Sequence, residues 1–241
     1  MKGAVLICLG VLIGARGVAA GTVDASKYDA FWLWSGVAPQ PVLKQARCVY
    51  VLQGQIEAQK GDESHVRFVA QGVAVPHNQP VEVWLAYRVH TLHWTPREYA
   101  ILLAQLHRWR RAGNKVVGVQ IDFDARTLHL QEYMAFLERL RGQLPSEDRL
   151  SITGLLDWSS RIGPEDVNRL RGIVDEVVVQ TYQGRHTIEN YSSYLPRVSR
   201  LALPFKIGLI QGGAWDAPMN FETSPWFRGY VVLLQNPRAT K

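Results

Sequence analysis

The sequence predicts an α/β fold, a small (β/α)8 barrel of the TIM type with a β-hairpin inserted after the second strand. Three observations support it: eight segments have the composition of buried strands, helical segments lie between several of them, and most strands are continuous β-branched or apolar runs. Continuous runs are typical of parallel strands that are covered on both faces. The alternative is an open, doubly wound sheet, but a count of eight strands favours the barrel.

The predicted strands begin at residue 28 and continue almost to the end of the chain. They are Tyr28–Trp34, Arg47–Leu52, Val81–Tyr87, Val116–Asp122, Arg149–Leu155, Val174–Thr181, Phe205–Ile210 and Gly229–Leu234. Residues 54–78 do not fit a helix, and Val66–Val75 has the pattern of a strand pair or hairpin. The insertion is therefore placed after the second strand.

Four helices are predicted between the strands. The first has the strongest start signal, with Thr95 as N-cap, Pro96 in the first position and Glu98 in the third, and it stops before Gly113. The other three predicted helices are Thr127–Gln143, Pro164–Arg171 and Thr187–Val198.

The first twenty residues have the features of a secretory signal peptide. Lys2 supplies a positive charge, Ala4–Ile13 is a short apolar run, and Val18–Ala20 has the small residues of a cleavage site. The alternative is a membrane anchor, for which the apolar run is short. We therefore expect export from a bacterial cell to the periplasm or the medium, followed by one barrel domain over residues 21–241, because no repeat or low-complexity linker divides the chain.

Composition excludes several function classes. Cys48 is the one cysteine after residue 20, so no internal disulfide is expected in the exported chain. Without Lys2 and Arg16 the formal net charge falls from +6 to +4, with 25 basic and 21 acidic residues. This charge is mild and, in an exported protein, does not indicate nucleic-acid binding, although it is compatible with an anionic glycan. No later segment is long and apolar enough for stable membrane insertion, and no dinucleotide, phosphate-loop or cysteine-pair motif predicts a cofactor or metal. The sequence makes no prediction of oligomeric state.

Polar and aromatic residues follow the predicted strands where a barrel has its active site, at the carboxyl ends. Carboxylates, amides and tryptophans are the side chains that bind sugars, so we expect a carbohydrate partner, although any single tryptophan also fits core packing. The candidate substrate-binding residues are Trp34, Arg88, Asp157, Gln180, Gln211 and Trp215.

The fourth predicted strand ends in Asp122-Phe123-Asp124. Asp122 and Asp124 have the same parity on an extended strand, so both side chains point the same way. Neighbouring carboxylates push their pKa values apart, and the protonated one can act as a general acid. The structural alternative is that these carboxylates cap the next helix or pair with Arg88 or Arg126.

The segment VGVQIDFD, residues 117–124, resembles the DGxDxDxE motif of family 18 chitinases. In that alignment Asp124 occupies the position of the catalytic glutamate, Asp122 that of the neighbouring aspartate, and Gln120 replaces the first aspartate. The segment QTYQ at 180–183 is similar to that family's MxYD and keeps only Tyr182. The tryptophan that closes the last strand in that family is also missing.

Over a longer stretch, the segments YDAFWLWSGV, GVQIDFDA and LSITGLL more closely resemble a family of exported bacterial proteins, domain of unknown function 3142. This resemblance implies a barrel related to glycosidases and implies no reaction.

The leading hypothesis is glycoside hydrolysis, with Asp124 as general acid and Asp122 as the partner that orients a substrate N-acetyl group or stabilises positive charge. Tyr182 would donate a hydrogen bond to the developing intermediate. Arg88 and Gln180 would orient the substrate, and Trp34 and Trp215 would stack on sugar rings. Without an N-acetyl group a second carboxylate is required, for which Asp157 and then Asp216 are candidates.

Two alternatives come from other function classes. A non-catalytic glycan-binding protein fits the chitinase residues that are missing. A metal-dependent hydrolase or deacetylase could use His90 and His93 beside Asp122 and Asp124, although two histidines three residues apart are more often surface residues.

Overall fold

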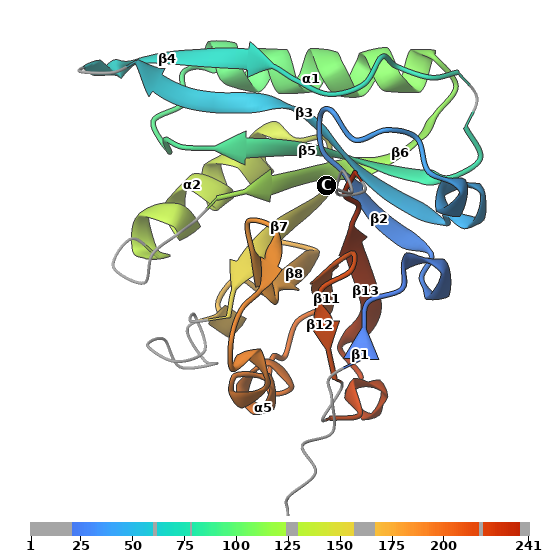
Figure 1. The fold of residues 1–241 in the computed structure, drawn as a ribbon. Helices are drawn as coiled ribbons and strands as arrows, with labels where there is room; N and C mark the ends of the chain where they lie inside the picture. Colours follow the sequence, from blue (N-terminus) through green and yellow to red (C-terminus); the bar gives the residue numbers. More distant parts are fainter. Residues whose placement is uncertain are drawn as a thin grey trace, which may run out of the picture.

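The computed structural model describes residues 21–59, 62–77, 79–123, 130–156, 167–216 and 219–236. Within these residues eight parallel strands form a closed barrel (Figure 1). The strands follow one another around the barrel in chain order, and β2 closes it by pairing with both β13 and β3. They are β2 (Ala30–Leu33), β3 (Cys48–Gln59), β5 (Glu82–Val89), β6 (Lys115–Asp122), β7 (Arg149–Leu155), β8 (Glu176–Gln180), β11 (Phe205–Ile210) and β13 (Phe227–Leu233). The predicted barrel and all eight of its strands are confirmed, and the open sheet is wrong.

The hairpin inserted after the second barrel strand is present, but its first strand is not where the sequence indicated. β3 runs on past the barrel, and its residues 54–59 pair antiparallel with β4 (Asp62–Ala70). The pairing of β3 with β5 shifts register between Leu52 and Gly54, and such a bulge bends a strand. A Cβ on Gly54 would come within 2.3 Å of the Phe68 ring, so glycine lets the two strands of the hairpin pack closely. The hairpin projects at the upper left of Figure 1.

Two full helices cover the barrel in the described residues. α1 (Pro96–Arg111) follows β5, and α2 (Leu130–Gln143) follows β6. The predicted capping box of α1 is confirmed, because the Thr95 backbone N–H donates to Glu98 Oε2 at 2.8 Å and the Arg97 N–H donates to Thr95 Oγ1. In the part of the chain that the structure describes, no helix has the length and apolarity to cross a membrane.

The remaining elements are short. Two-residue strands form two small pairs, β1 (Gly21–Thr22) with β12 (Ala214–Trp215) and β9 (Tyr182–Gln183) with β10 (His186–Thr187). The single-turn helices are η1 (Ala25–Lys27), η2 (Pro41–Gln45), η4 (Tyr191–Ser193), α5 (Leu195–Val198) and η5 (Phe221–Thr223).

The predicted helix Thr187–Val198 is wrong. The chain forms the β9–β10 hairpin, then η4 and the single turn α5. Asn190 has φ 57°, in the left-handed region, which an α-helix cannot include. Pro196 also lacks the N–H that a continuing helix needs. The predicted helix Pro164–Arg171 begins outside the described residues. Residues 127–129, the start of the second predicted helix, also lie outside them.

Apolar side chains between the barrel and its outer layer form the larger core. α2 contributes Tyr133, Phe136, Leu137 and Leu140 at helical spacing, all fully buried, and α1 contributes Leu102, Leu106 and Trp109. Each buried side chain of this size stabilises the fold by about 1.5–3 kcal/mol relative to an exposed one. These side chains hold the two helices against the strands that carry the barrel mouth.

Large aromatic side chains fill the inside of the barrel. Trp32, Tyr50 and Trp84 are buried there, and the rings of Tyr50 and Trp84 are stacked with centroids 5.7 Å apart. A Cβ on Gly208 would lie 2.7 Å from the Trp32 ring, so a glycine on β11 makes the room that this indole occupies. The interior is therefore a packed core and leaves the barrel open only near its ends.

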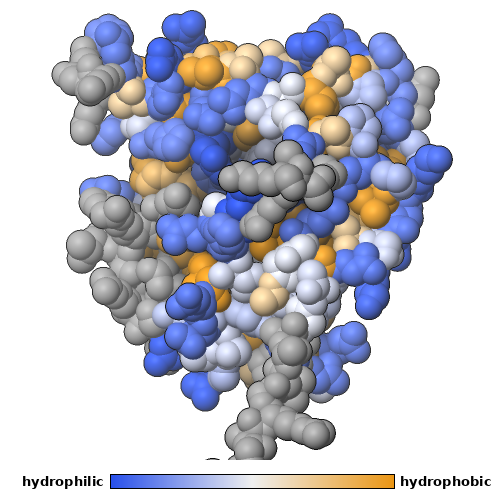
Figure 2. Space-filling model, in the orientation of Figure 1, coloured by the Kyte–Doolittle hydropathy of each residue, from blue (hydrophilic) through white to orange (hydrophobic). Residues whose placement is uncertain are grey.

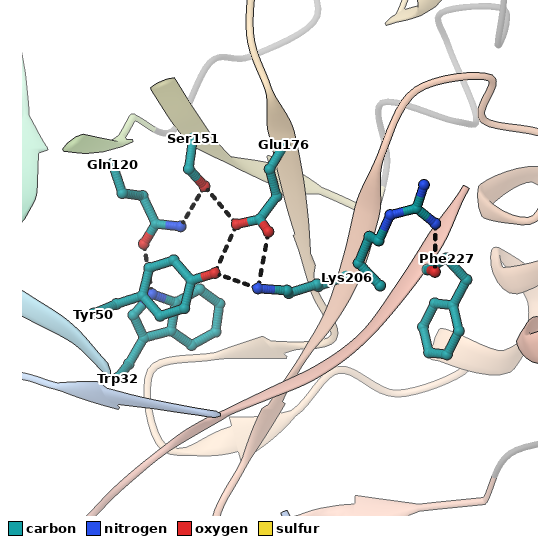
Figure 3. A network of polar contacts seen from close by, with 8 residues as sticks. Trp32, Tyr50, Gln120, Ser151, Glu176, Lys206 and Phe227 are labelled. Atoms are coloured by element: carbon teal, nitrogen blue, oxygen red, sulfur yellow. Dashed lines mark hydrogen bonds and ion pairs between the residues drawn. The ribbon is translucent and has the colours of Figure 1, made fainter. Parts of the chain in front are cut away.

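A continuous polar network crosses this core (Figure 3). Trp32 Nε1 donates to Gln120 Oε1 at 2.6 Å, and Gln120 Nε2 donates to Ser151 Oγ at 2.9 Å. The Ser151 hydroxyl and the Tyr50 hydroxyl both donate to Glu176 Oε1, at 3.0 and 2.6 Å. Lys206 Nζ lies 2.9 Å from Glu176 Oε2, so the buried carboxylate has a partly buried cation as partner.

We predict that Glu176→Gln lowers the free energy of unfolding by about 3 kcal/mol, because it leaves the partly buried Lys206 charge without its counter-charge. Urea unfolding measures this. The control is Glu82→Gln, which breaks the exposed pair with Lys115 and is expected to cost less than about 1 kcal/mol. Equal effects of the two variants would contradict a structural role for the buried pair.

Cys48 lies beside this network, and burial raises the pKa of its thiol to about 12. Since the thiolate is the reactive form, we predict that a maleimide does not label Cys48 in the native protein at pH 8 but labels it rapidly in urea. Mass spectrometry of the peptide that contains Cys48 separates this residue from Cys8. Equal labelling rates with and without urea would show that β3 opens readily.

Candidate functional site at the barrel mouth

A cavity of about 760 Å³ lies at the carboxyl ends of the barrel strands. Parallel closure brings these ends together, which is why residues far apart in the sequence share its wall. Strand residues or the residues just after a strand supply much of the lining: Trp34, Arg88, Asp122, Leu155, Gln180, Tyr182, Leu233 and Asn236. Five of the predicted site residues therefore come together here: Trp34, Arg88, Asp122, Gln180 and Tyr182.

Asp122 is the last residue of β6 and is only 5% exposed. Each of its carboxylate oxygens accepts a hydrogen bond from a neighbouring strand. Arg88 Nε on β5 donates to Oδ2 at 3.0 Å, and Thr153 Oγ1 on β7 donates to Oδ1 at 2.9 Å. A carboxylate held on both oxygens has a fixed orientation, and a nearly buried one needs such partners. The pairing with Arg88, which was the structural alternative for this residue, is present, and Asp122 also lines the cavity.

Arg88 connects Asp122 to Trp34. Its guanidinium carbon lies 5.3 Å from the centroid of the Trp34 ring, within the range of a cation–π contact. One face of the Trp34 ring is therefore covered by protein. Trp34 lines the cavity, and a sugar that stacks on it would use the remaining face or edge.

Gln180 and Tyr182 occupy the end of β8 and the start of β9. Their side chains approach each other, with 3.4 Å between Gln180 Nε2 and the Tyr182 hydroxyl oxygen. The Tyr182 ring packs edge-on against Trp32 of the barrel interior, with centroids 6.1 Å apart. The interior packing thus positions a phenol at the cavity wall.

Two predicted substrate-binding residues lie outside the cavity lining. Trp215 stacks on Tyr191, with ring centroids 5.1 Å apart, so its indole packs in the β1–β12 region. Its assignment as a stacking platform is not supported by this placement. Gln211 lies behind the rim, where its Oε1 accepts from the Gln235 backbone N–H at 2.9 Å and its Nε2 donates to Gln40 Oε1 at 2.9 Å. It therefore supports the rim residue Gln235.

Asp124 and Asp157 lie outside the described residues. His90 and His93, the histidines of the metal hypothesis, do not line the cavity. Among the described residues, no three histidine, cysteine or acidic side chains form a group that could hold a metal ion. The candidate carboxylate Asp216 accepts, through its backbone oxygen, a hydrogen bond from the Tyr191 hydroxyl.

Sequence reasoning did not select several residues of the rim. Arg185 lies at the tip of the β9–β10 hairpin, and the sequence predicted no hairpin there but a helix that begins at Thr187. Gln235 and Asn236 directly follow the last strand, and this position at a strand end is the sequence feature that could have identified them as rim residues. The loop after β2 contributes Ser35, Gly36 and Val37.

The described residues expose few large apolar side chains. Figure 2 shows a face that is mostly hydrophilic, with apolar residues in small separate groups. Among the described residues, Val73 is the one exposed large hydrophobic side chain.

Comparison with known families finds a match over part of the chain. The model of the family "Domain of unknown function (DUF3142)" matches residues 92–191, which include Asp122, Gln180, Tyr182 and Arg185. This match confirms the resemblance that the sequence motifs indicated. The family's description assigns no activity.

A search of solved structures finds a similar chain in the crystal structure of the Bacillus cereus spore cortex-lytic enzyme SleL. The TM-score is 0.48 with 15% sequence identity, over 81% of this chain and 51% of that one. The chain thus spans about half the length of that enzyme. No curated protein matches.

We predict an energetic coupling of about 1–2 kcal/mol between Arg88 and Asp122, because a charged hydrogen bond joins a buried carboxylate to a partly exposed guanidinium. The measurement is a double-mutant cycle of Arg88→Met and Asp122→Asn, followed by urea unfolding. Additivity of the two single effects within about 0.5 kcal/mol would mean that the pair does not fix the carboxylate.

Proposed function

We propose that the protein is a glycoside hydrolase-like barrel that binds a polysaccharide or an N-acetylated glycan in the mouth cavity. One observation carries the proposal: the nearly buried Asp122 carboxylate, held by Arg88 and Thr153, lies on the wall of a cavity of about 760 Å³ at the carboxyl ends of the strands. That end of a (β/α)8 barrel is where its enzymes have their active sites. The size of the cavity is in the range of small-molecule sites.

In this proposal Asp122 orients the substrate or stabilises positive charge and does not transfer a proton. Both of its oxygens already accept hydrogen bonds, one of them from a guanidinium. A carboxylate oriented by both oxygens can supply negative charge close to an oxocarbenium-like transition state. Tyr182, on the same cavity wall, donates a hydrogen bond to the substrate or the intermediate.

The proposed general acid is Asp124, two residues after Asp122 in the sequence. The support is the alignment with the chitinase-like motif, where Asp124 takes the position of a glutamate. An aspartate is shorter by one methylene, or roughly 1.3–1.5 Å on ordinary covalent geometry. We therefore propose a substrate that approaches β6 more closely than a chitin chain approaches the glutamate of that family.

We also propose that the protein acts outside the cytoplasm, because residues 1–20 have the pattern of a signal peptide. A polysaccharide of the bacterial envelope or of the medium is the substrate expected there.

The test is release of reducing ends from a panel of bacterial and N-acetylated glycans, with and without a chelator. We predict that Asp124→Asn lowers the rate about 10²- to 10⁴-fold, the usual contribution of a general acid, and that Asp122→Asn lowers it with little change in substrate affinity. Glu82→Gln, at the amino end of β5, is the control and is expected to keep the wild-type rate. Unchanged turnover in Asp124→Asn would remove this residue as the acid.

A second candidate is a glycan-binding protein without catalysis. The observation that favours it is that the one carboxylate of the described cavity lining is engaged at both oxygens. Saturable binding of a glycan without product, in the wild type and in Asp124→Asn alike, would establish this function. Activity that a chelator abolishes would instead support the metal-dependent alternative.

A further inference from the structure

Arg185 belongs to the cavity wall and is fixed there by the fold of a tight hairpin. Gln183 of β9 pairs with His186 of β10, and Gly184 has φ 58°, the left-handed conformation that such a turn needs. The turn brings Arg185 to the rim, where its Nη2 donates to the Asn236 backbone oxygen at 3.2 Å.

Asn236 joins this hairpin to the loop after β2. Its Nδ2 donates to the Gly36 backbone oxygen at 2.7 Å, and its Oδ1 accepts from the Ala38 N–H at 2.8 Å. Arg185 therefore rests on a rim whose segments are linked by hydrogen bonds. A guanidinium anchored through one nitrogen keeps its other donors for a ligand.

The charges of the described cavity lining are unequal. Arg88 and Arg185 are its cations, and Asp122 is its carboxylate. Asp122 is paired with Arg88. Arg185 has no ion pair with any acidic side chain in the ranges that the structure describes. Within the described cavity wall, the positive charge of Arg185 therefore has no acidic side chain as its counter-ion.

We propose that the glycan bound in this cavity carries a carboxylate and that Arg185 binds it. This inference rests on the proposed function and names the substrate class. A guanidinium presents a planar set of donors that matches a carboxylate in two parallel hydrogen bonds, which a neutral sugar hydroxyl cannot replace. Arg185 is exposed at the cavity rim, where water and salt screen this attraction. Arg88, already held by Asp122, orients the neutral part of the same ligand.

The test compares each acidic oligosaccharide with its own methyl ester, which has nearly the same shape and no charge. The probes are oligogalacturonates and saccharides of alternating N-acetylglucosamine and N-acetylmuramic acid, measured by titration calorimetry against the full chain. We expect at least one acid to bind about 10- to 100-fold more tightly than its ester, the usual range for a charge-assisted hydrogen bond. Failure of every acid to bind more tightly than its ester would overturn the proposal.

The variant Arg185→Gln is expected to remove this preference and to leave the affinity for the ester unchanged. The matched control is Arg228→Gln, which makes the same change of net charge at the amino end of β13, where Arg228 donates to its own neighbouring backbone oxygens. If both variants lose the preference equally, general electrostatic attraction and not Arg185 is responsible, and the proposal is wrong.

The outcomes separate this inference from the proposed function. Hydrolysis of a neutral glycan that does not depend on Arg185 would overturn the carboxylate proposal and leave glycoside hydrolysis intact. Binding of an acid through Arg185 without any product would support the carboxylate proposal and reject hydrolysis.

Discussion

Pairing of β2 with both β13 and β3 is the constraint on which the rest of the structure depends. It converts a row of parallel strands into a closed barrel, so that the carboxyl ends of all eight strands surround one mouth. Asp122, Gln180 and Trp34 are distant in the sequence and share a wall for this reason. Closure also creates an interior that must be filled, and Trp32 fills much of it in the space that Gly208 leaves on β11.

Closure of the barrel also gives Gln120 and Asp122, two residues apart on β6, different structural roles. Gln120 and Asp122 have the same parity, and each meets a hydroxyl of β7, Ser151 for the amide and Thr153 for the carboxylate. Gln120 lies in the packed interior, where it accepts from Trp32, whereas Asp122 reaches the cavity. The glutamine that replaces the first aspartate of the chitinase-like motif is therefore a core residue that joins the polar network around Glu176. The interior and the mouth are rigidly connected through one strand.

Strand composition was sufficient to predict the barrel, because continuous apolar runs such as residues 177–179 have few alternatives once eight of them alternate with helices. The capping box at Thr95 depends only on residues close in the sequence, so it could also be predicted, and it is confirmed. The error at Thr187–Val198 arose because the β9–β10 turn depends on Gly184 and on pairing with residues before the predicted helix. The position of Asp122 at the carboxyl end of a predicted strand correctly indicated that it lies at the mouth. That Asp124 points the same way stays a prediction, because Asp124 lies outside the described residues. The stacking of Trp215 on Tyr191 could not be predicted, because Tyr191 lies 24 residues earlier and no local pattern reveals the contact.

The central claim is that the mouth cavity is where the protein binds its ligand. The most direct measurement is amide chemical-shift mapping of the ¹⁵N-labelled protein with the panel of acidic and N-acetylated oligosaccharides. The account predicts that the largest shifts come from the cavity wall, at residues 34–37, 183–185 and 233–236. Shifts concentrated at the opposite end of the barrel, around Arg171 and Trp226, or no shifts with any member of the panel, would contradict it.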